Sequence, residues 1–200
     1  NLNGFILTIS PTGYLAETPG NVLYGTSGWV TTTRSINAPS SMNVGGLGAV
    51  LTSSANLGST EIRRGHTVQT GAFLGTSIQR YFDITPANNT GLNATLRFKY
   101  DESEIGGSNE NLLTLYSSTN SGTNWTSRGG IPDGSNNHIT INNLNSFSRW
   151  TANSNYYTAL IGIGIQGFYN AATNRMNQKD TVRVYLRNAN APYNIVDSAK

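Results

Sequence analysis

The stretch Ala94-Thr-Leu-Arg-Phe-Lys-Tyr-Asp101 decides the fold class of this chain. Its apolar and polar residues alternate, so that one face is apolar and the other is polar. This period of two is typical of a β-strand with one buried face, since a helix repeats every 3.6 residues. We therefore predict that Leu96 and Phe98 point into a hydrophobic core.

The segments on either side of this strand extend the β pattern. Residues 78–85 have the pattern of a preceding strand with apolar side chains on one face, and the turn-forming residues 86–91 (Pro-Ala-Asn-Asn-Thr-Gly) follow it. On the other side, a turn at residues 101–107 leads to apolar residues at 112–116. The sequence thus predicts three consecutive strands joined by two turns.

Composition also indicates an all-β fold. Of the 200 residues, 36% are hydrophobic and 12% are charged, about half the charged fraction that is usual in globular proteins. Asn, Ser and Thr fill the difference, and they suit turns and outward sheet faces better than helices. Short strands recur with no helical window between them, so we expect an antiparallel β-sandwich of the Greek-key or jelly-roll type. Further strands are predicted at residues 5–9, 22–24, 29–36, 49–52, 60–63, 67–69, 139–141 and 147–151.

A change of sequence character at residues 151–155 (Thr-Ala-Asn-Ser-Asn) predicts a domain boundary. We expect a β-sandwich domain at residues 1–152 and a partial second β module at residues 153–200. The second segment has predicted strands at residues 156–165, 181–186 and 193–196. About 45 residues without a disulfide rarely sustain a core of their own. We therefore expect this module to be completed by a neighbouring subunit or by further sequence.

Charge and cysteine content exclude several classes of site. The net charge is only +3 and the basic residues are scattered, so we expect no nucleic-acid partner and predict that Arg183 and Arg187 lie on a solvated strand face. The absence of cysteine excludes disulfides, thiolate metal sites and cysteine nucleophiles. The most apolar run, residues 159–165, is far shorter than the ~20 residues of a membrane-spanning helix, so we expect no membrane insertion.

The residue types of catalysis and metal binding do not form a known motif. His66 and His138 are the only histidines, and the sequence has no zinc-protease, serine-hydrolase or phosphate-loop motif. We therefore expect a non-enzymatic protein with no catalytic residues, no cofactor and no bound metal. Asp101, Glu102 and Glu104 could supply Ca²⁺ ligands or a glycosidase carboxylate pair, but they lack the regular calcium-loop spacing. We predict a solvated turn at these residues.

Residues 118–125 (Ser-Thr-Asn-Ser-Gly-Thr-Asn-Trp) resemble the Asp-box hairpin of sialidase-type propellers, with Asn120 in place of the aspartate. A propeller repeats this motif in each blade, whereas it occurs once here. We therefore predict a structural hairpin anchored by Trp125.

The aromatic residues allow two interpretations. Trp29, Trp125 and Trp150, together with ten tyrosines, could form a platform on which sugar rings stack. Burial in the sandwich core is the alternative, and we favour it because aromatic residues dominate such cores.

A further pattern extends over most of the chain beyond about residue 40. Its segments are residues 60–69 (TEIRRGHTVQ), 78–86 (IQRYFDITP), 90–98 (TGLNATLRF), 146–151 (SFSRWT), 166–169 (QGFY), 180–187 (DTVRVYLR) and 191–199 (APYNIVDSA). The first four resemble a β-sandwich module common in large modular surface and secreted proteins of Bacteroidota, often found ahead of a type IX secretion sorting region. The last three resemble the opening of a separate β module of those proteins. The resemblance implies an extracellular or cell-surface location, and O-glycosylation at Thr181 and Ser198 within the D-[ST]-apolar pattern.

The apolar strand at residues 156–165 leads to a prediction about assembly. Its three isoleucines share one face and its glycines leave the other almost bare, so the strand needs a close neighbour. A partner strand could come from further sequence or from another subunit by strand addition, with the N-terminal strand at residues 5–9 as acceptor or donor. The expected subunit contacts are Phe5, Leu7, Ile161, Ile163, Ile165, Val182 and Val184.

These observations predict a non-enzymatic, extracellular structural or adhesive building block of a bacterial surface protein or filament, assembling head to tail. Its partners would be other copies of itself or neighbouring β modules. The alternative is a carbohydrate-binding module of a secreted hydrolase, with surface glycans as the partner.

Overall fold

The computed structural model describes residues 1–71, 74–154, 169–176, 184–187 and 195–199. The chain divides into two compact units, residues 1–156 and 157–200. No helix among the described residues is long and apolar enough to cross a membrane.

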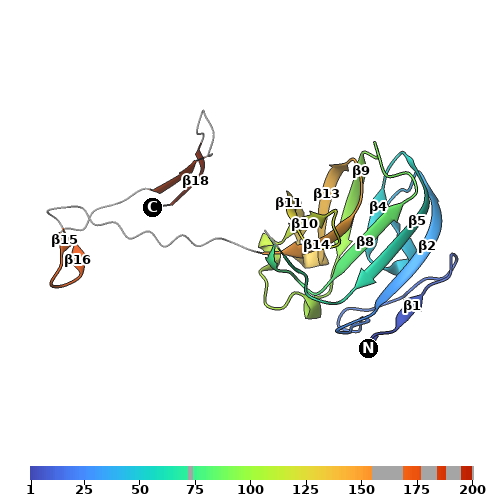
Figure 1. The fold of residues 1–200 in the computed structure, drawn as a ribbon, viewed down its shortest axis with the longest axis horizontal. Helices are drawn as coiled ribbons and strands as arrows, with labels where there is room; N and C mark the ends of the chain where they lie inside the picture. Colours follow the sequence, from blue (N-terminus) through green and yellow to red (C-terminus); the bar gives the residue numbers. More distant parts are fainter. Residues whose placement is uncertain (72–73, 155–168, 177–183, 188–194, 200) are drawn as a thin grey trace. The chain divides into compact units, whose positions relative to one another are not determined.

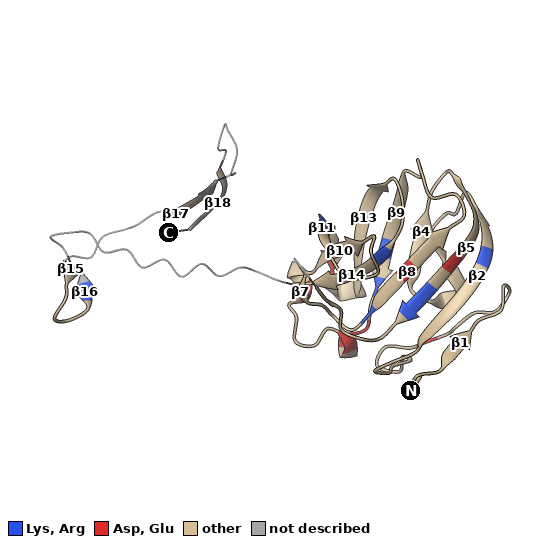
Figure 2. Ribbon diagram, viewed as in Figure 1, with Lys and Arg blue, Asp and Glu red and all other residues tan. Residues whose placement is uncertain are grey.

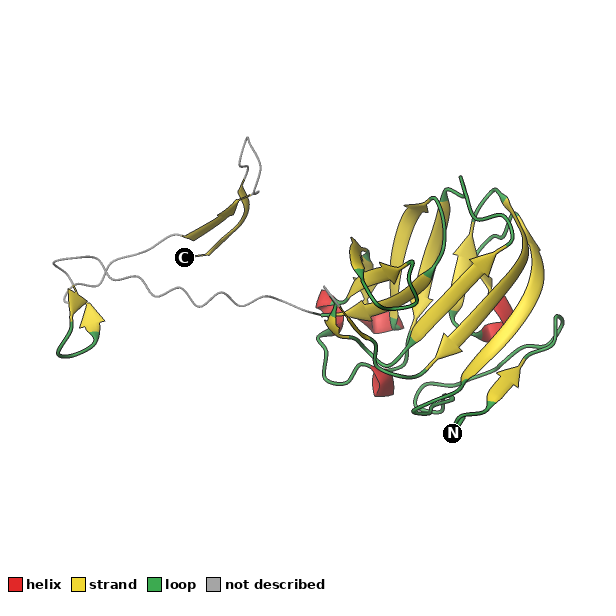
Figure 3. Ribbon diagram, viewed as in Figure 1, coloured by secondary structure: helices red, strands yellow, loops and turns green. Residues whose placement is uncertain are grey.

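The first unit is a β-sandwich of two sheets, as predicted (Figures 1 and 3). The strands of the larger sheet, in spatial order, are β1 (Ile6–Thr8), β2 (Trp29–Asn37), β5 (Asn56–Gly65), β8 (Tyr81–Pro86), β14 (Arg149–Asn153), β10 (Thr114–Ser118) and β11 (Thr126–Gly129). Those of the smaller sheet are β12 (Ile131–Asp133), β13 (His138–Leu144), β9 (Ala94–Lys99), β4 (Ala49–Thr52) and β3 (Met42–Asn43). All neighbouring strands run antiparallel except β1 and β2, which are parallel.

Short elements connect these strands. A small antiparallel ribbon contains β6 (Thr70–Gly71) and β7 (Gly75–Thr76). The described 3-10 turns are η1 (Val44–Gly46), η2 (Glu102–Glu104), η3 (Glu110–Leu112) and η4 (Gly134–Asn136). They lie in the loops that join the strands (Figure 3).

The core lies between the two sheets and is centred on β8 and β9. Leu96 and Phe98 of β9 are fully buried, which confirms the inward face predicted from the alternation. From the opposite sheet, Phe82 meets Phe98 edge to face, with ring centroids 4.9 Å apart. Such T-shaped pairs are favourable beyond the area that they bury. This pair therefore joins the two layers directly.

Two predicted strands are wrong, because their backbone groups bond to other partners. We call residues 9–28, between β1 and β2, the strap. Within it, the predicted strand at 22–24 is absent, since the Leu23 amide donates to the Glu17 carboxylate instead of to a ladder. Residues 67–69 are also outside any strand, and the Gln69 amide donates to Ser77 Oγ.

The described residues of the second unit form two separate ribbons. In one, β15 (Tyr169–Asn170) pairs with β16 (Arg175–Met176); in the other, β17 (Val184–Arg187) pairs with β18 (Ile195–Ala199). The predicted strand at residues 156–165 lies outside the described residues, as does Arg183. A two-stranded ribbon of this length is marginally stable by itself in water.

Candidate functional site

A cavity of about 420 Å³ lies where the strap meets the ends of β5 and β9. The strap forms one wall, and the loop around η1 and the η4 turn form others. Close backbone contact holds the strap here, because the Leu15 amide donates to the Gly45 carbonyl over 2.9 Å. A Cβ atom on Gly46, whose φ is +74°, would lie 2.1 Å from the Leu15 oxygen. Glycine is therefore required at this position.

A buried ion pair anchors the strap beneath the cavity. Arg64 of β5 is fully buried and its two terminal nitrogens donate to the two oxygens of Glu17, over 2.7 and 2.6 Å. Burial alone raises the pKa of Glu17, but the hydrogen bonds and charge of Arg64 outweigh it, so the net pKa lies below its usual value. A bidentate pair of this geometry is among the strongest side-chain contacts.

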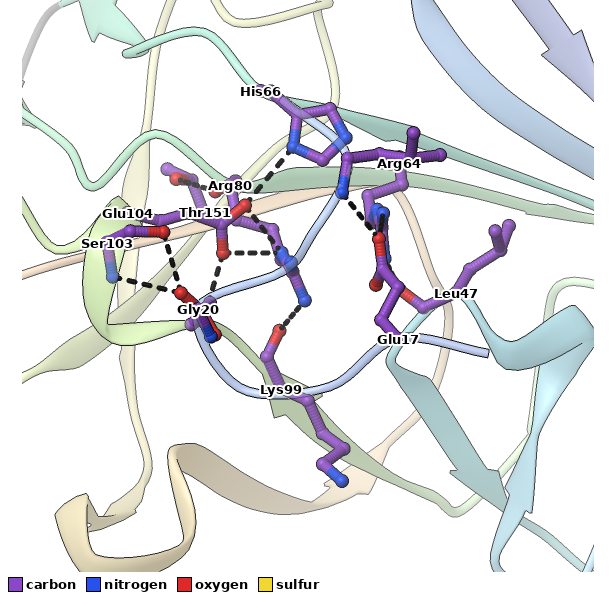
Figure 4. A network of polar contacts seen from close by, with 12 residues as sticks. Glu17, Gly20, Leu47, Arg64, His66, Arg80, Lys99, Ser103, Glu104 and Thr151 are labelled. Atoms are coloured by element: carbon purple, nitrogen blue, oxygen red, sulfur yellow. Dashed lines mark hydrogen bonds and ion pairs between the residues drawn. The ribbon is translucent and has the colours of Figure 1, made fainter. Parts of the chain in front are cut away.

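A second buried cluster lies next to the first (Figure 4). Glu104 of η2 accepts from Arg80 Nε over 2.8 Å and faces His66 Nδ1 at 3.1 Å. Arg80 also donates from Nη1 to the Lys99 carbonyl. Arg80 Nη2 and His66 Nε2 have no hydrogen-bond partner among the described residues. Glu104 at the centre of the cluster is thus fully hydrogen-bonded, whereas these two outer nitrogens could each form one more hydrogen bond.

The prediction of a solvated turn at Asp101 to Glu104 is wrong for two of its three carboxylates. Asp101 and Glu104 are 4% and 2% exposed, whereas Glu102 is exposed. The two buried carboxylates form a capping box: Asp101 accepts from the Ser103 amide and Glu104 accepts from the Asp101 amide. Asp101 also accepts from the amide of Gly20 in the strap. Each buried carboxylate thus accepts hydrogen bonds from specific donors, and these bonds offset the free-energy cost of its burial.

The electrostatics keep His66 neutral. Burial lowers its pKa below the ordinary value of 6.5, and the neighbouring guanidinium groups of Arg64 and Arg80 act in the same direction, against the hydrogen bond with Glu104. Because a carboxylate only accepts, the neutral ring carries its proton on Nδ1 and leaves the Nε2 lone pair free. Burial raises the pKa of Glu104, but the His66 hydrogen bond and the Arg80 charge lower it more strongly.

We predict that acid destabilises the fold in two steps. Since the pKa of His66 is lowered, the unfolded state binds more protons below pH 6.5, so the stability from neutral His66 is complete above that pH and falls below it. The lowered pKa values of Glu17 and Glu104 make their contribution complete above pH 4.5 and lost on further acidification. Denaturant melts across this range should show that His66→Gln flattens the first step alone, whereas His138→Gln keeps it. A full first step in His66→Gln would contradict the assignment.

Comparison of the chain with protein-family models, with curated proteins and with solved structures finds no significant match. Nor do the described residues contain a grouping of three or more His, Cys, Asp or Glu side chains that could hold a metal ion.

The tryptophans divide between the core and the sheet face. Trp125 and Trp150 are each 2% exposed, as the burial alternative requires. Trp29 is half-buried, and the Arg63 guanidinium lies over its ring, 5.5 Å from the centroid. The favoured burial interpretation is therefore confirmed for Trp125 and Trp150, and the alternative of a platform made by all three tryptophans is excluded. Strand β5 of the larger sheet, next to the strand that carries Trp29, contains both acidic and basic residues (Figure 2).

The hairpin at residues 118–125 has the predicted structural role. Asn120 Oδ1 accepts from the Asn124 backbone amide and from Ser118 Oγ, so the Asn120 side chain takes the position expected of the Asp-box carboxylate. Trp125 Nε1 donates to the Gly122 carbonyl and the buried ring closes the turn. These contacts account for every part of the motif without a ligand.

The residues predicted to contact another subunit or to carry a glycan fall into three groups. Phe5 and Leu7 are 74% and 39% exposed at the β1 edge of the larger sheet. Val184 belongs to β17 and Ser198, a predicted glycosylation site, to β18. The others lie outside the described residues: Ile161, Ile163, Ile165, Val182 and the second glycosylation site, Thr181.

Proposed function

We propose that this chain is a non-enzymatic structural or adhesive building block of an extracellular bacterial surface, which joins copies of itself by β-strand addition. The observation that carries the proposal is the edge strand β1. It pairs in parallel with β2 over three residues, and Phe5, Ile6 and Leu7 are 74%, 54% and 39% exposed.

An exposed apolar edge strand is unusual in a protein that remains monomeric. Folded proteins commonly protect their sheet edges with charge, proline or a covering segment, because an open edge pairs with other chains. None of residues 5–8 is charged or proline. Strand addition uses the backbone groups of such an edge for affinity and the side chains for register. These features support β1 as an assembly edge.

The second unit is the proposed partner of this edge. Its β17–β18 ribbon has no third strand among the described residues, and a ribbon needs a third strand or a packed face for independent stability. The predicted isoleucine strand and Val182 and Val184 belong to the same unit. Joining the second unit of one copy to β1 of the next is head to tail, which produces filaments unless the rotation closes a ring.

The proposed extracellular location is supported only by the resemblance of the sequence segments to modules of Bacteroidota surface proteins. A surface protein of the Bacteroidota type would be secreted and could carry O-glycans at Thr181 and Ser198. Intact-mass measurement of the protein isolated from its native surface would test this, and an unmodified mass would remove the glycan from the proposal.

The assembly proposal predicts a clear difference between two matched variants. Ile6 and Ile131 are exposed isoleucines on edge strands of different sheets, 54% and 69% exposed. In analytical ultracentrifugation, the 200-residue chain should form larger species as its concentration rises. Ile6→Lys should keep it monomeric, because a charge opposes strand addition at that edge, and Ile131→Lys should assemble normally.

Deletion of residues 157–200 should likewise leave a folded monomer. The proposal would be overturned if the deleted chain still assembled, if the intact chain stayed monomeric at high concentration, or if both lysine variants behaved alike.

A further inference from the structure

The cavity beside the strap has the size and the free groups of a small-ligand site. Its volume of about 420 Å³ falls within the range of roughly 300–1,000 Å³ found for ligand pockets. It is lined by buried Arg80 and by the more exposed Tyr14, Lys99 and Asn137, among others. The site is separate from the proposed assembly edge, and the inference drawn from it does not depend on assembly.

The carboxylates at this cavity already accept hydrogen bonds, whereas a buried donor group has no partner in the described part of the chain. Both oxygens of Glu17 accept from Arg64, and both of Asp101 accept from Gly20 or Ser103. Glu104, below the cavity, uses both oxygens as well. In contrast, Arg80 Nη2 is buried and has no partner among the described residues. Arg80 lines the cavity, so a ligand oxygen that reaches this nitrogen would supply the acceptor that it lacks.

The rim adds groups that can both donate and accept. Among the described residues, the Asn137 side-chain amide makes no hydrogen bond, and Asn136 uses its amide nitrogen, on Asp133, but not its Oδ1. Amide groups of this kind match hydroxyl groups, which also donate and accept. A ligand rich in hydroxyl groups would satisfy the rim and Arg80 together.

An exposed aromatic ring stands at the same rim. Tyr14 is 63% exposed, and its hydroxyl accepts from Asn43 Nδ2 over 3.2 Å, which holds the ring in place. An aromatic ring offers a flat apolar face next to a polar edge, as the apolar face of a sugar requires. Tyr14 therefore supplies the stacking surface that the buried Trp125 and Trp150 do not.

The charges around the cavity are balanced. Arg64, Arg80 and Lys99 are the basic lining residues, and Glu17 and Asp101, with Glu104 beneath, equal them in number. Figure 4 shows the Lys99 side chain extending away from the paired groups. The negative charge of an anionic ligand would have no excess positive charge among these residues to compensate it, whereas a neutral ligand keeps the charges balanced.

We propose that this cavity binds one end of a neutral glycan, with a sugar ring against Tyr14, its hydroxyl groups on Asn137 and Asn136, and one oxygen accepting from Arg80. The strap positions the stacking ring, and the Arg64–Glu17 ion pair and the hydrogen bond from Gly20 to Asp101 hold the strap. The chain would then adhere to a glycan-coated surface.

Two matched pairs of variants test this site. Tyr14→Ala removes the rim ring, and Tyr24→Ala removes a tyrosine of the strap that is 58% exposed and does not line the cavity. Asn137→Gly removes the rim amide at a left-handed position with φ of 50°, where glycine preserves the backbone, and Asn143→Gly makes the same change at φ of 59° outside the cavity.

The 200-residue chain would be applied to an array of neutral and uronate-containing oligosaccharides, and the best neutral sugar titrated by calorimetry. We expect saturable binding, weakened about tenfold by Tyr14→Ala and by Asn137→Gly, and changed less than about twofold by both controls. Unchanged thermal melting of the variants would exclude unfolding as the cause. Tyr14→Phe keeps the ring but loses the hydrogen bond from Asn43, so it should weaken binding less than Tyr14→Ala does.

Three results would overturn the proposal. One is the absence of any neutral sugar that binds more tightly than about 1 mM. Another is binding confined to the acidic oligosaccharides, and the third is neutral-sugar binding that Tyr14→Ala and Asn137→Gly leave unchanged in folded protein.

Discussion

Replacement of Phe98 by alanine is expected to lower the free energy of unfolding of the first unit by about 3–5 kcal/mol. Phe98 is fully buried, lies between β4 and β13 in the smaller sheet, and meets Phe82 of the larger sheet at 4.9 Å. Truncation removes both its buried area and the edge-to-face pair, and the cavity that remains sits where the two sheets meet.

Denaturant melts of dilute protein would measure this loss. Phe5→Ala is the matched control, since Phe5 is 74% exposed and its removal should change the free energy of unfolding by less than about 0.5 kcal/mol. A loss of less than about 1 kcal/mol in Phe98→Ala would mean that the core collapses around the gap, contrary to a tightly packed interface between the sheets.

The second large effect is expected from Glu104→Gln. Arg80 is 3% exposed and its Nε is 2.8 Å from Glu104, so the substitution keeps the shape but leaves a buried guanidinium without its counter-charge. Removing one partner of a buried ion pair typically costs about 3–5 kcal/mol. The stability at neutral pH should fall by that amount.

Glu102→Gln provides the comparison within the same 3-10 turn. Glu102 is exposed, so its substitution should change the stability by less than about 0.5 kcal/mol. If Glu104→Gln were equally mild in urea melts, water would have to reach Arg80, and the cluster would not be the buried anchor that its geometry indicates.

Local patterns in the sequence predicted much of the first unit. β4 matches its predicted residues 49–52, and β9 and β2 differ from their predictions by one or two residues at one end. The hairpin at 118–125 was also predictable, because the hydrogen bonds that close its turn connect residues no more than four positions apart. Such contacts depend on nearby residue types alone.

The buried ion cluster was not predictable in the same way. Its members come from the strap, from β5 and the residue after it, from the residue before β8 and from the turn after β9, and Gly20 meets Asp101 across 81 positions. One sequence signal was present: Asp101 and Glu104 have the spacing of a capping box before a turn. That spacing predicts the turn, but it carries no information about burial.

The sequence by itself determined the two-residue periodicity of the strands, the turns between them and the all-β class, because side-chain direction in a strand depends only on position along the chain. Only the tertiary structure decided which charged residues lose their water. Arg63 and Arg64 are neighbours in β5, yet one lies on the exposed face and the other is fully buried against Glu17. The alternation of a strand assigns them to opposite faces, but the strap that covers one face and brings Glu17 to it is placed by long-range packing.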